Sequence, residues 1–156
     1  MNIIEGEYSI GDAEIGIVVG RFNELITDQL LHGCVDALAR CGIGAERLQI
    51  VRVPGAFEVP LALKRLAETG RYAALVAIAC VIRGATPHFE YVAGECATGV
   101  ARVSYDFEVP VGFGVLTVDT VEQAIERAGT KAGNKGADAA MAAVELAGLL
   151  RKLGNP

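Results

Sequence analysis

The run AALVAIACVI, at residues 73–82, is the most informative segment of this chain for its architecture. Every residue in it is apolar, so neither face of a strand built from it would suit contact with water. Strands of this kind occur in parallel sheets whose two faces are both covered by helices. We therefore expect residues 73–82 to form a strand that is buried on both faces.

Apolar runs of strand length also occur on both sides of this segment. They lie at residues 15–20, 48–53 and 110–117. Between and after these runs, apolar residues recur at helical spacing. The predicted helices lie at residues 24–41, 57–69, 89–105, 121–129 and 137–153, and the second of them is expected to start near residues 57 to 59. Strands that alternate with helices imply an α/β fold with a parallel sheet, here as one domain over residues 1–156.

The ends of two helices carry recognisable signals. Asn23 precedes the first helix and is expected to cap it, while Gly42 is well placed to end it. The segment TVDT, at residues 117–120, is expected to cap the helix at 121–129 in the same way.

The composition excludes several classes of protein. The 156 residues are 52% hydrophobic and 21% charged, which is typical of a folded chain and not of a disordered one. A net charge of −5 without a basic run argues against nucleic acid as a partner. The longest apolar run, YAALVAIACVI, is too short to span a bilayer, and the N-terminus lacks the basic residues of a signal peptide. We therefore expect a cytoplasmic protein with no membrane partner.

The cysteines give no sign of a metal site. Cys34, Cys41, Cys80 and Cys96 form no C-x-x-C pair, and their spacings match no zinc pattern. We expect them to be reduced and mostly buried thiols, and we expect no bound metal.

The segments that follow the first three strands predict a pocket. They read GRFN, PGAFE and RGATPHF, and each combines a glycine with an aromatic residue. In parallel sheets, ligands bind at the carboxyl ends of the strands, where glycine allows close approach and an aromatic ring stacks on a planar ligand. Neither the G-x-G-x-x-G pattern of dinucleotide sites nor the lysine of a P-loop is present. We therefore expect a pocket for a flat, polar heterocycle.

Five segments, spread in order from residue 20 to residue 136, carry a family likeness. They are GRFN, VPGAFEVPLA, VIRGATPHFEYV, FGVLT and EQAIERAGTKAGNKG. With these segments the chain resembles 6,7-dimethyl-8-ribityllumazine synthase, the penultimate enzyme of riboflavin biosynthesis. The resemblance implies a flavodoxin-like, three-layer αβα sandwich with a four-stranded parallel sheet. It also implies condensation of 5-amino-6-(D-ribitylamino)uracil with 3,4-dihydroxy-2-butanone 4-phosphate, without a metal or an organic cofactor.

The resemblance assigns one set of residues to the pyrimidine and its ribityl chain. Phe22 matches the aromatic residue that stacks on the ring. The segment after the second strand matches the part that holds the ribityl chain and the ring edge, and the end of the third strand matches the lining of the ring pocket. These residues are Ala56, Phe57 and Glu58 in the first segment, and Cys80, Val81 and Ile82 in the second.

A second set is assigned to the phosphate and to the neighbouring subunit. Ala85 and Thr86 match the phosphate-binding loop, and Arg127 matches the cation that clamps the phosphate in bidentate fashion. Phe113 matches an aromatic residue from the adjacent subunit, although its pattern alone fits a core residue of the fourth strand equally well. Lys135 matches a polar contact near the site.

His88 matches the proton-transfer residue of the family. Imidazole serves as acid and base near neutral pH, which suits a condensation that loses water and phosphate. A lone histidine is more often structural, but the surrounding RGATPHFE favours the catalytic interpretation. Glu90 is a candidate for orienting the imidazole, while His32 lies in a helix without a motif and is interpreted as structural.

The resemblance also implies assembly into pentamers, which some family members join into an icosahedral capsid. The corner GTKAGN, residues 129–134, has no insertion and matches the capsid-forming pattern, although it also fits a plain turn. Residues 1–12 form an N-terminal arm that we expect to add to the sheet edge of a neighbour. Riboflavin synthase is a candidate partner whose association the sequence leaves open.

Two further functions fit part of the same pattern. A flavin- or lumazine-binding protein without turnover would keep Phe22 and the ring pocket but would not need His88 or Arg127. A shell protein with a vestigial site would lose the phosphate loop, yet GATPH is intact. Both observations favour the enzyme.

Overall fold

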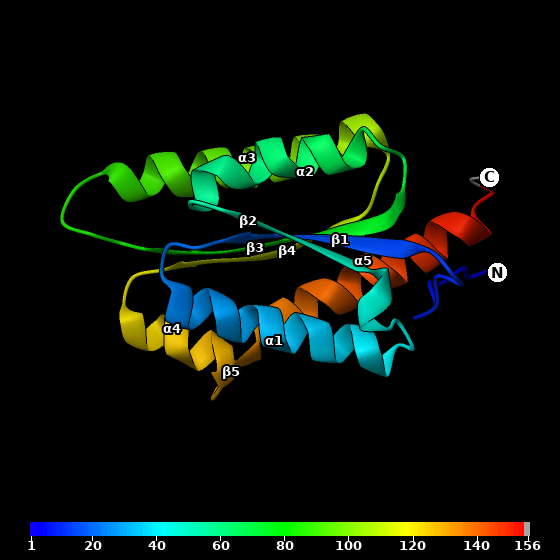
Figure 1. Ribbon diagram of the computed structural model, residues 1–156, viewed down its shortest axis with the longest axis horizontal. Coiled ribbons are helices and arrows are strands. Elements are labelled where there is room, and N and C mark those ends of the chain that lie inside the picture. The colour runs from blue at the N-terminus through cyan, green and yellow to red at the C-terminus, as the bar shows by residue number, and fades with distance from the viewer. Residues whose placement is uncertain (155–156) are drawn as a thin grey trace.

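The fold is a parallel sheet that lies between two layers of helices (Figure 1). A computed structural model describes residues 1–154 of the chain. The sheet has the strand order β2-β1-β3-β4, and neighbouring strands run parallel. Its strands are β1 (Glu14–Gly20), β2 (Leu48–Val53), β3 (Tyr72–Ile82) and β4 (Val111–Val118). The predicted three-layer α/β fold is confirmed.

Each face of the sheet is covered by its own set of helices and has its own apolar core (Figure 1). Right-handed crossovers cause this division, because the chain passes from β1 to β2 on one face and returns across β1 to β3 on the other. The first face carries α1 (Glu24–Arg40), α4 (Val121–Arg127) and α5 (Lys135–Lys152). The second face carries the 3₁₀ turn η2 (Ala56–Glu58), α2 (Val59–Ala67) and α3 (His88–Phe107).

Strand β3 is buried on both faces, as its apolar sequence predicts. The side chains of Ala74 through Ile78 are 0% exposed. Val76 and Ile78 belong to the core beneath α1 and α5, whereas Leu75 and Ala77 belong to the core beneath α2 and α3. The alternation of side chains along a strand thus places one strand in both cores.

Helix α1 begins and ends where the sequence predicts, but its N-terminal cap differs. Gly42 has a φ of 79°, the left-handed conformation that stops a helix. Asn23 occupies the N-cap position, but its side chain makes no capping bond, so the expected cap is wrong. The amide instead donates to the carbonyl of Cys80 at the end of β3. The cap of α4 is confirmed, because the Gln123 N–H donates to Thr120 Oγ1.

The corner between the last two helices is a small antiparallel hairpin, which the sequence pattern did not predict. It pairs β5 (Ala128–Thr130) with β6 (Gly133–Asn134). Gly129 and Gly133 have φ values of 109° and 75°, so glycines serve this corner by adopting left-handed conformations.

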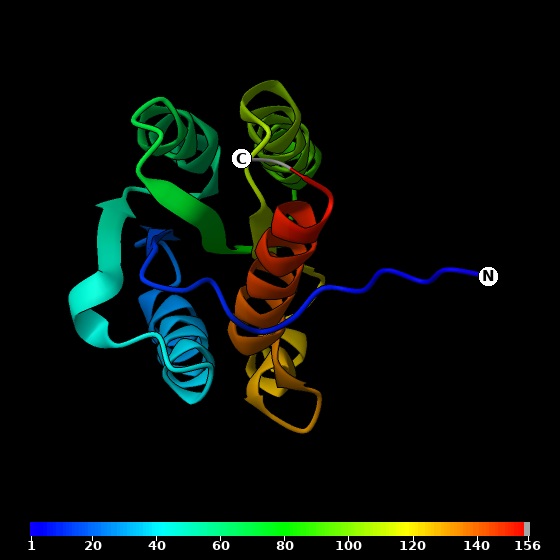
Figure 2. The ribbon, with the colours of Figure 1, turned by 90° about the vertical axis from the view of Figure 1, so that its right-hand side faces the viewer.

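The N-terminal arm lies outside the sheet. Its first residues are exposed, and the N-terminus lies apart from the body of the chain (Figure 2). Further along, Tyr8 donates to Glu145 on α5 across 3.1 Å, and Lys152 donates to the carbonyl of Glu5. The arm therefore rests against α5 before the chain enters β1.

The four cysteines are free thiols, and three of them are buried, which confirms the expectation of reduced, mostly buried residues. None of the helices within residues 1–154 combines the length and apolar character needed to cross a bilayer.

Candidate active site

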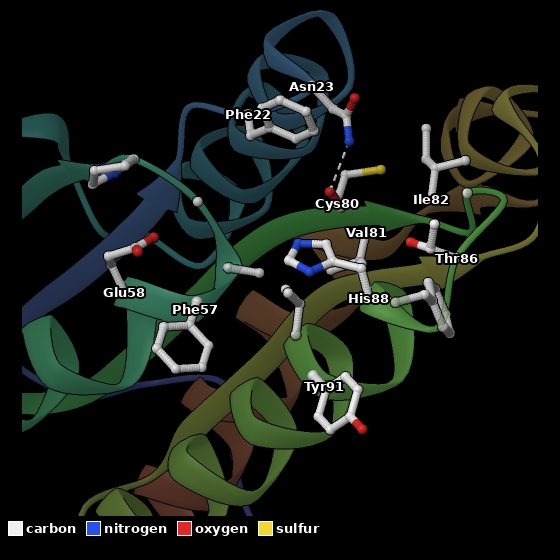
Figure 3. Close-up of a pocket in the computed structure, with 16 residues that line it drawn as sticks. Phe22, Asn23, Phe57, Glu58, Cys80, Val81, Ile82, Thr86, His88 and Tyr91 are labelled. Atoms are coloured by element: carbon white, nitrogen blue, oxygen red, sulfur yellow. Dashed lines mark hydrogen bonds between the residues drawn. The ribbon is translucent and has the colours of Figure 1, made fainter.

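A pocket of about 650 Å³ lies at the carboxyl ends of β1, β2 and β3 (Figure 3). This volume is in the range of small-molecule sites, roughly 300–1,000 Å³. The three strand exits that were expected to meet do form this pocket. Its lining comprises Phe22, Asn23, residues 54–58, residues 80–82, Gly84, Thr86, His88, Phe89, Tyr91 and Val92.

The exit of β1 presents Phe22 at the pocket. Pairing with the β2 segment continues past the end of the strand, because the Arg21 and Phe22 N–H groups donate to the carbonyls of Val53 and Pro54 at 2.8 and 3.0 Å. These bonds fix the backbone, while the side chain of Phe22 stays 73% exposed. The ring is therefore held in place with surface free for stacking.

Asn23 ties this exit to the end of β3. Its backbone is left-handed, with φ 61° and ψ 49°, and its Nδ2 donates to the Cys80 carbonyl across 2.9 Å (Figure 3). Asparagine tolerates this conformation better than most residues. Asn23 was predicted only to cap a helix, and its place in the pocket was not predicted, although it directly follows Phe22 in the GRFN motif.

The exit of β2 forms the opposite wall. It approaches the β1 exit closely, because a Cβ on Gly20 would lie 3.2 Å from the carbonyl carbon of Gly55. Beyond it, η2 presents Ala56, Phe57 and Glu58 to the pocket. Phe57 is 58% exposed, so a second aromatic ring stands free in the lining of the pocket.

The end of β3 contributes Cys80, Val81 and Ile82 to the pocket. Burial raises the pKa of the Cys80 thiol to about 11, so it is protonated near neutral pH and is a poor nucleophile. Within residues 1–154, no group of three or more His, Cys, Asp and Glu side chains is arranged to hold a metal ion.

His88 is the first residue of α3, one position earlier than the predicted start of this helix. Figure 3 shows its imidazole pointing from the start of α3 into the pocket. Tyr91 and Val92 follow at i+3 and i+4, on the same face of the helix, and also line the pocket. This helical spacing was the signal that could have predicted both residues. Glu90, a candidate for orienting the imidazole, has its carboxylate on Arg83 instead.

Four expected site residues do not line this pocket within one chain: Ala85, Phe113, Arg127 and Lys135. Phe113 lies on the edge strand β4 and is 45% exposed, so it is not a fully buried core residue. Arg127 ends α4, where its Nη1 donates to the Gln123 carbonyl across 3.0 Å.

The GNKG segment, residues 133–136, has a structural role that was not predicted from the sequence. Lys135 begins α5 and pairs with Asp138 at 2.9 Å. Asn134 caps α5 by accepting from the Gly136 N–H, and it also donates to the Gln29 carbonyl on α1. The segment therefore joins α5 to α1.

The fold and the pocket together define a class of protein: an α/β protein with a pocket of small-molecule size at the carboxyl ends of its strands. The model of the 6,7-dimethyl-8-ribityllumazine synthase family matches residues 12–151. The chain therefore belongs to this family and is a transferase of riboflavin biosynthesis. Small molecules are its substrates, and members of the family typically assemble as oligomers.

Proposed function

We propose that the chain condenses 5-amino-6-(D-ribitylamino)uracil with 3,4-dihydroxy-2-butanone 4-phosphate. The products are 6,7-dimethyl-8-ribityllumazine, inorganic phosphate and water. The observation that carries this proposal is the placement of Phe22, Glu58 and His88 around one pocket of ligand size. The reaction joins an amine to a ketone and eliminates phosphate without net redox change, so it needs no redox cofactor, and the family resemblance implies neither a metal nor an organic cofactor.

In this proposal the pyrimidine ring stacks on Phe22. Support comes from the exposed ring of Phe22 and from the mainly apolar pocket beside it. The side chain of Glu58 and the backbone of Ala56 and Phe57 hold the ribityl chain and the ring edge, because hydroxyls need hydrogen-bonding partners once they leave water. Cys80, Val81 and Ile82 form the apolar floor.

His88 transfers protons in the proposed reaction. An amine attacks the ketone, the carbinolamine loses water, phosphate leaves, and ring closure releases a second water. Each step moves protons, and an imidazole directed into the pocket suits both uptake and release.

The phosphate of the four-carbon substrate is assigned to Ala85, Thr86 and Arg127. Thr86 lines the pocket beside Gly84, and backbone N–H groups of such a loop bind anions well. The Arg127 guanidinium is partly exposed, and its protein contacts are with Gln123 and Glu126 of the same helix. A planar guanidinium fits phosphate oxygens in bidentate fashion.

We further propose that the site is completed between subunits of a pentamer. Phe113 is exposed on the edge strand and would reach a neighbour's pocket, and the arm at residues 1–12 would pair with a neighbour's sheet. The glycine corner at 129–134 suits the angle at which pentamers meet in an icosahedral capsid. Riboflavin synthase is a candidate partner of that assembly, and the cytoplasm is its proposed location.

An assay with both substrates tests the function directly. Formation of a fluorescent lumazine with equimolar phosphate release supports the proposal. Binding of the lumazine without turnover would favour a storage or carrier protein instead, and absence of both would favour a shell protein. Negative-stain microscopy at neutral pH in phosphate buffer tests the assembly. Hollow shells are expected, whereas only free pentamers or decamers would refute the capsid and leave the enzyme assignment intact.

A further inference from the structure

The side chain of Arg83 joins three parts of the chain at the rim of the site. Arg83 directly follows β3, and its backbone N–H donates to the Val118 carbonyl across 2.8 Å, so the sheet fixes its starting point. Its Nε donates to Asp119 Oδ1 across 2.9 Å, and its Nη1 donates to Glu90 Oε1. Its Cζ lies 4.3 Å from the centre of the Phe89 ring.

These partners belong to the two segments that carry the proposed chemistry. Phe89 and Glu90 lie in the first turn of α3, immediately after His88. Asp119 lies in the turn between β4 and α4, the helix that ends at Arg127. A guanidinium that is stacked on a ring and hydrogen-bonded to two carboxylates therefore connects these two segments.

The connection continues to Arg127 through hydrogen bonds. The Asp119 N–H donates to Gln123 Oε1 across 2.7 Å, and the Gln123 carbonyl accepts from Arg127 Nη1 across 3.0 Å. The start of the helix that bears His88 is thereby linked to the guanidinium of Arg127, although the two residues lie in different elements.

The positive charge of Arg83 is already balanced by the carboxylates of Asp119 and Glu90. Hydrogen bonds to Asp119 and then to Glu90 raise the pKa of Arg83, and the bond from Arg83 is the main cause that lowers the pKa of Glu90. A cation that faces two carboxylates is a weak anion site, so Arg83 is poorly suited to bind substrate phosphate itself, despite its position beside Gly84 and Ala85.

We propose that Arg83 is a positioning residue, which holds the turn that carries His88 against the β4–α4 turn and thereby sets the position of the His88 imidazole in the pocket. The proposal rests on the proposed function for its catalytic consequence, but the contact itself is a property of the protein alone.

Four variants test this role: Arg83→Gln, Asp119→Asn, the double variant, and Arg71→Gln as a matched control. Arg71 stands at the opposite end of β3, where it pairs with Glu14 at 2.7 Å and lies 5.5 Å from the Tyr72 ring. It thus has the same kinds of contact far from the pocket. Exposed ion pairs contribute little to folding, so all four variants should fold.

Steady-state kinetics with each substrate varied give the first readout. Arg83→Gln and Asp119→Asn should each lower kcat by about tenfold, since small misplacements of reacting groups are costly, with little change in either KM. The double variant should be no worse than the poorer single variant, because both remove one connection. Arg71→Gln should behave as wild type. A selective rise in KM for the phosphorylated substrate in Arg83→Gln alone would instead show that Arg83 binds phosphate, and wild-type kcat in Arg83→Gln would also overturn the proposal.

Hydrogen exchange gives a second readout that needs no substrate. Backbone amides of residues 84–86 and 88–92 should exchange several-fold faster in Arg83→Gln and Asp119→Asn than in wild type or Arg71→Gln, because the first turn of α3 loses its anchor. Unchanged exchange would refute the positioning role. If the wild type were inactive but the variants showed the expected exchange pattern, the proposed function would be refuted. The positioning contact of Arg83 would still be supported.

Discussion

Replacement of Asn23 tests how the mouth of the pocket is held together. The residue combines a left-handed backbone, at φ 61° and ψ 49°, with a 2.9 Å bond from Nδ2 to the Cys80 carbonyl. Alanine loses the bond, worth about 1 kcal/mol, and it tolerates the left-handed conformation less well than asparagine, by about 1–2 kcal/mol. We therefore expect Asn23→Ala to lower the free energy of unfolding by about 2–3 kcal/mol. Asn23→Gly loses the bond without the strain and should cost only about 1 kcal/mol.

Urea unfolding at one fixed protein concentration measures this difference, because assembly makes apparent stability depend on concentration. The difference in the free energy of unfolding between Asn23→Ala and Asn23→Gly isolates the contribution of the left-handed backbone conformation. Equal destabilisation by both substitutions would show that the left-handed conformation is not maintained. No effect of either would show that the bond to Cys80 contributes nothing, and the account of the pocket mouth would fail.

Four further predictions follow from the site and its support. His88→Ala should lower kcat by about 10- to 100-fold with an unchanged unfolding midpoint, the low end of acid–base effects because water enters the open pocket; unchanged turnover would remove His88 from the mechanism. Arg127→Ala should raise the KM for the phosphorylated substrate more than that for the pyrimidine, because it loses a charge-assisted bond worth about 1.5–3 kcal/mol. Inorganic phosphate should compete with the phosphorylated substrate in wild type. Equal effects on both substrates would contradict the assignment. Phe22→Ala should weaken lumazine binding by about 1–3 kcal/mol, because stacking on the ring is lost, and lumazine fluorescence measures this binding. Folding stability should stay almost unchanged because Phe22 is 73% exposed. A large loss of stability would instead indicate a packing role. Gly136→Ala should destabilise the fold by about 1–3 kcal/mol in urea unfolding, because its Cβ would lie 1.9 Å from the Leu30 carbonyl oxygen; wild-type stability would show that α1 and α5 separate easily.

Much of the architecture could be predicted from local patterns. The apolar segment at β3 indicated a strand in two cores, and helical spacing located the five helices, with start positions wrong by one residue at His88 and two at Lys135. The three glycine–aromatic exits also predicted a pocket at one edge of the sheet. These predictions succeeded because strand length, helical period and burial depend on residues that are near one another in sequence.

The contacts that organise the site required the folded chain. Asn23 reaches Cys80 across 57 positions, and Arg83 reaches Asp119 across 36. Asn23 therefore looked like a helix cap and Glu90 like a partner of His88, since each was judged against its neighbours in sequence. Local sequence patterns were sufficient to predict the main helices and strands, the layers and the edge of the sheet where the pocket lies. Only the strand order β2-β1-β3-β4 places the exits of β1 and β3 side by side and brings the β4–α4 turn to Arg83. Polar side chains form hydrogen bonds with groups that are close in space, so these partners were decided by the tertiary structure and not by position in the chain.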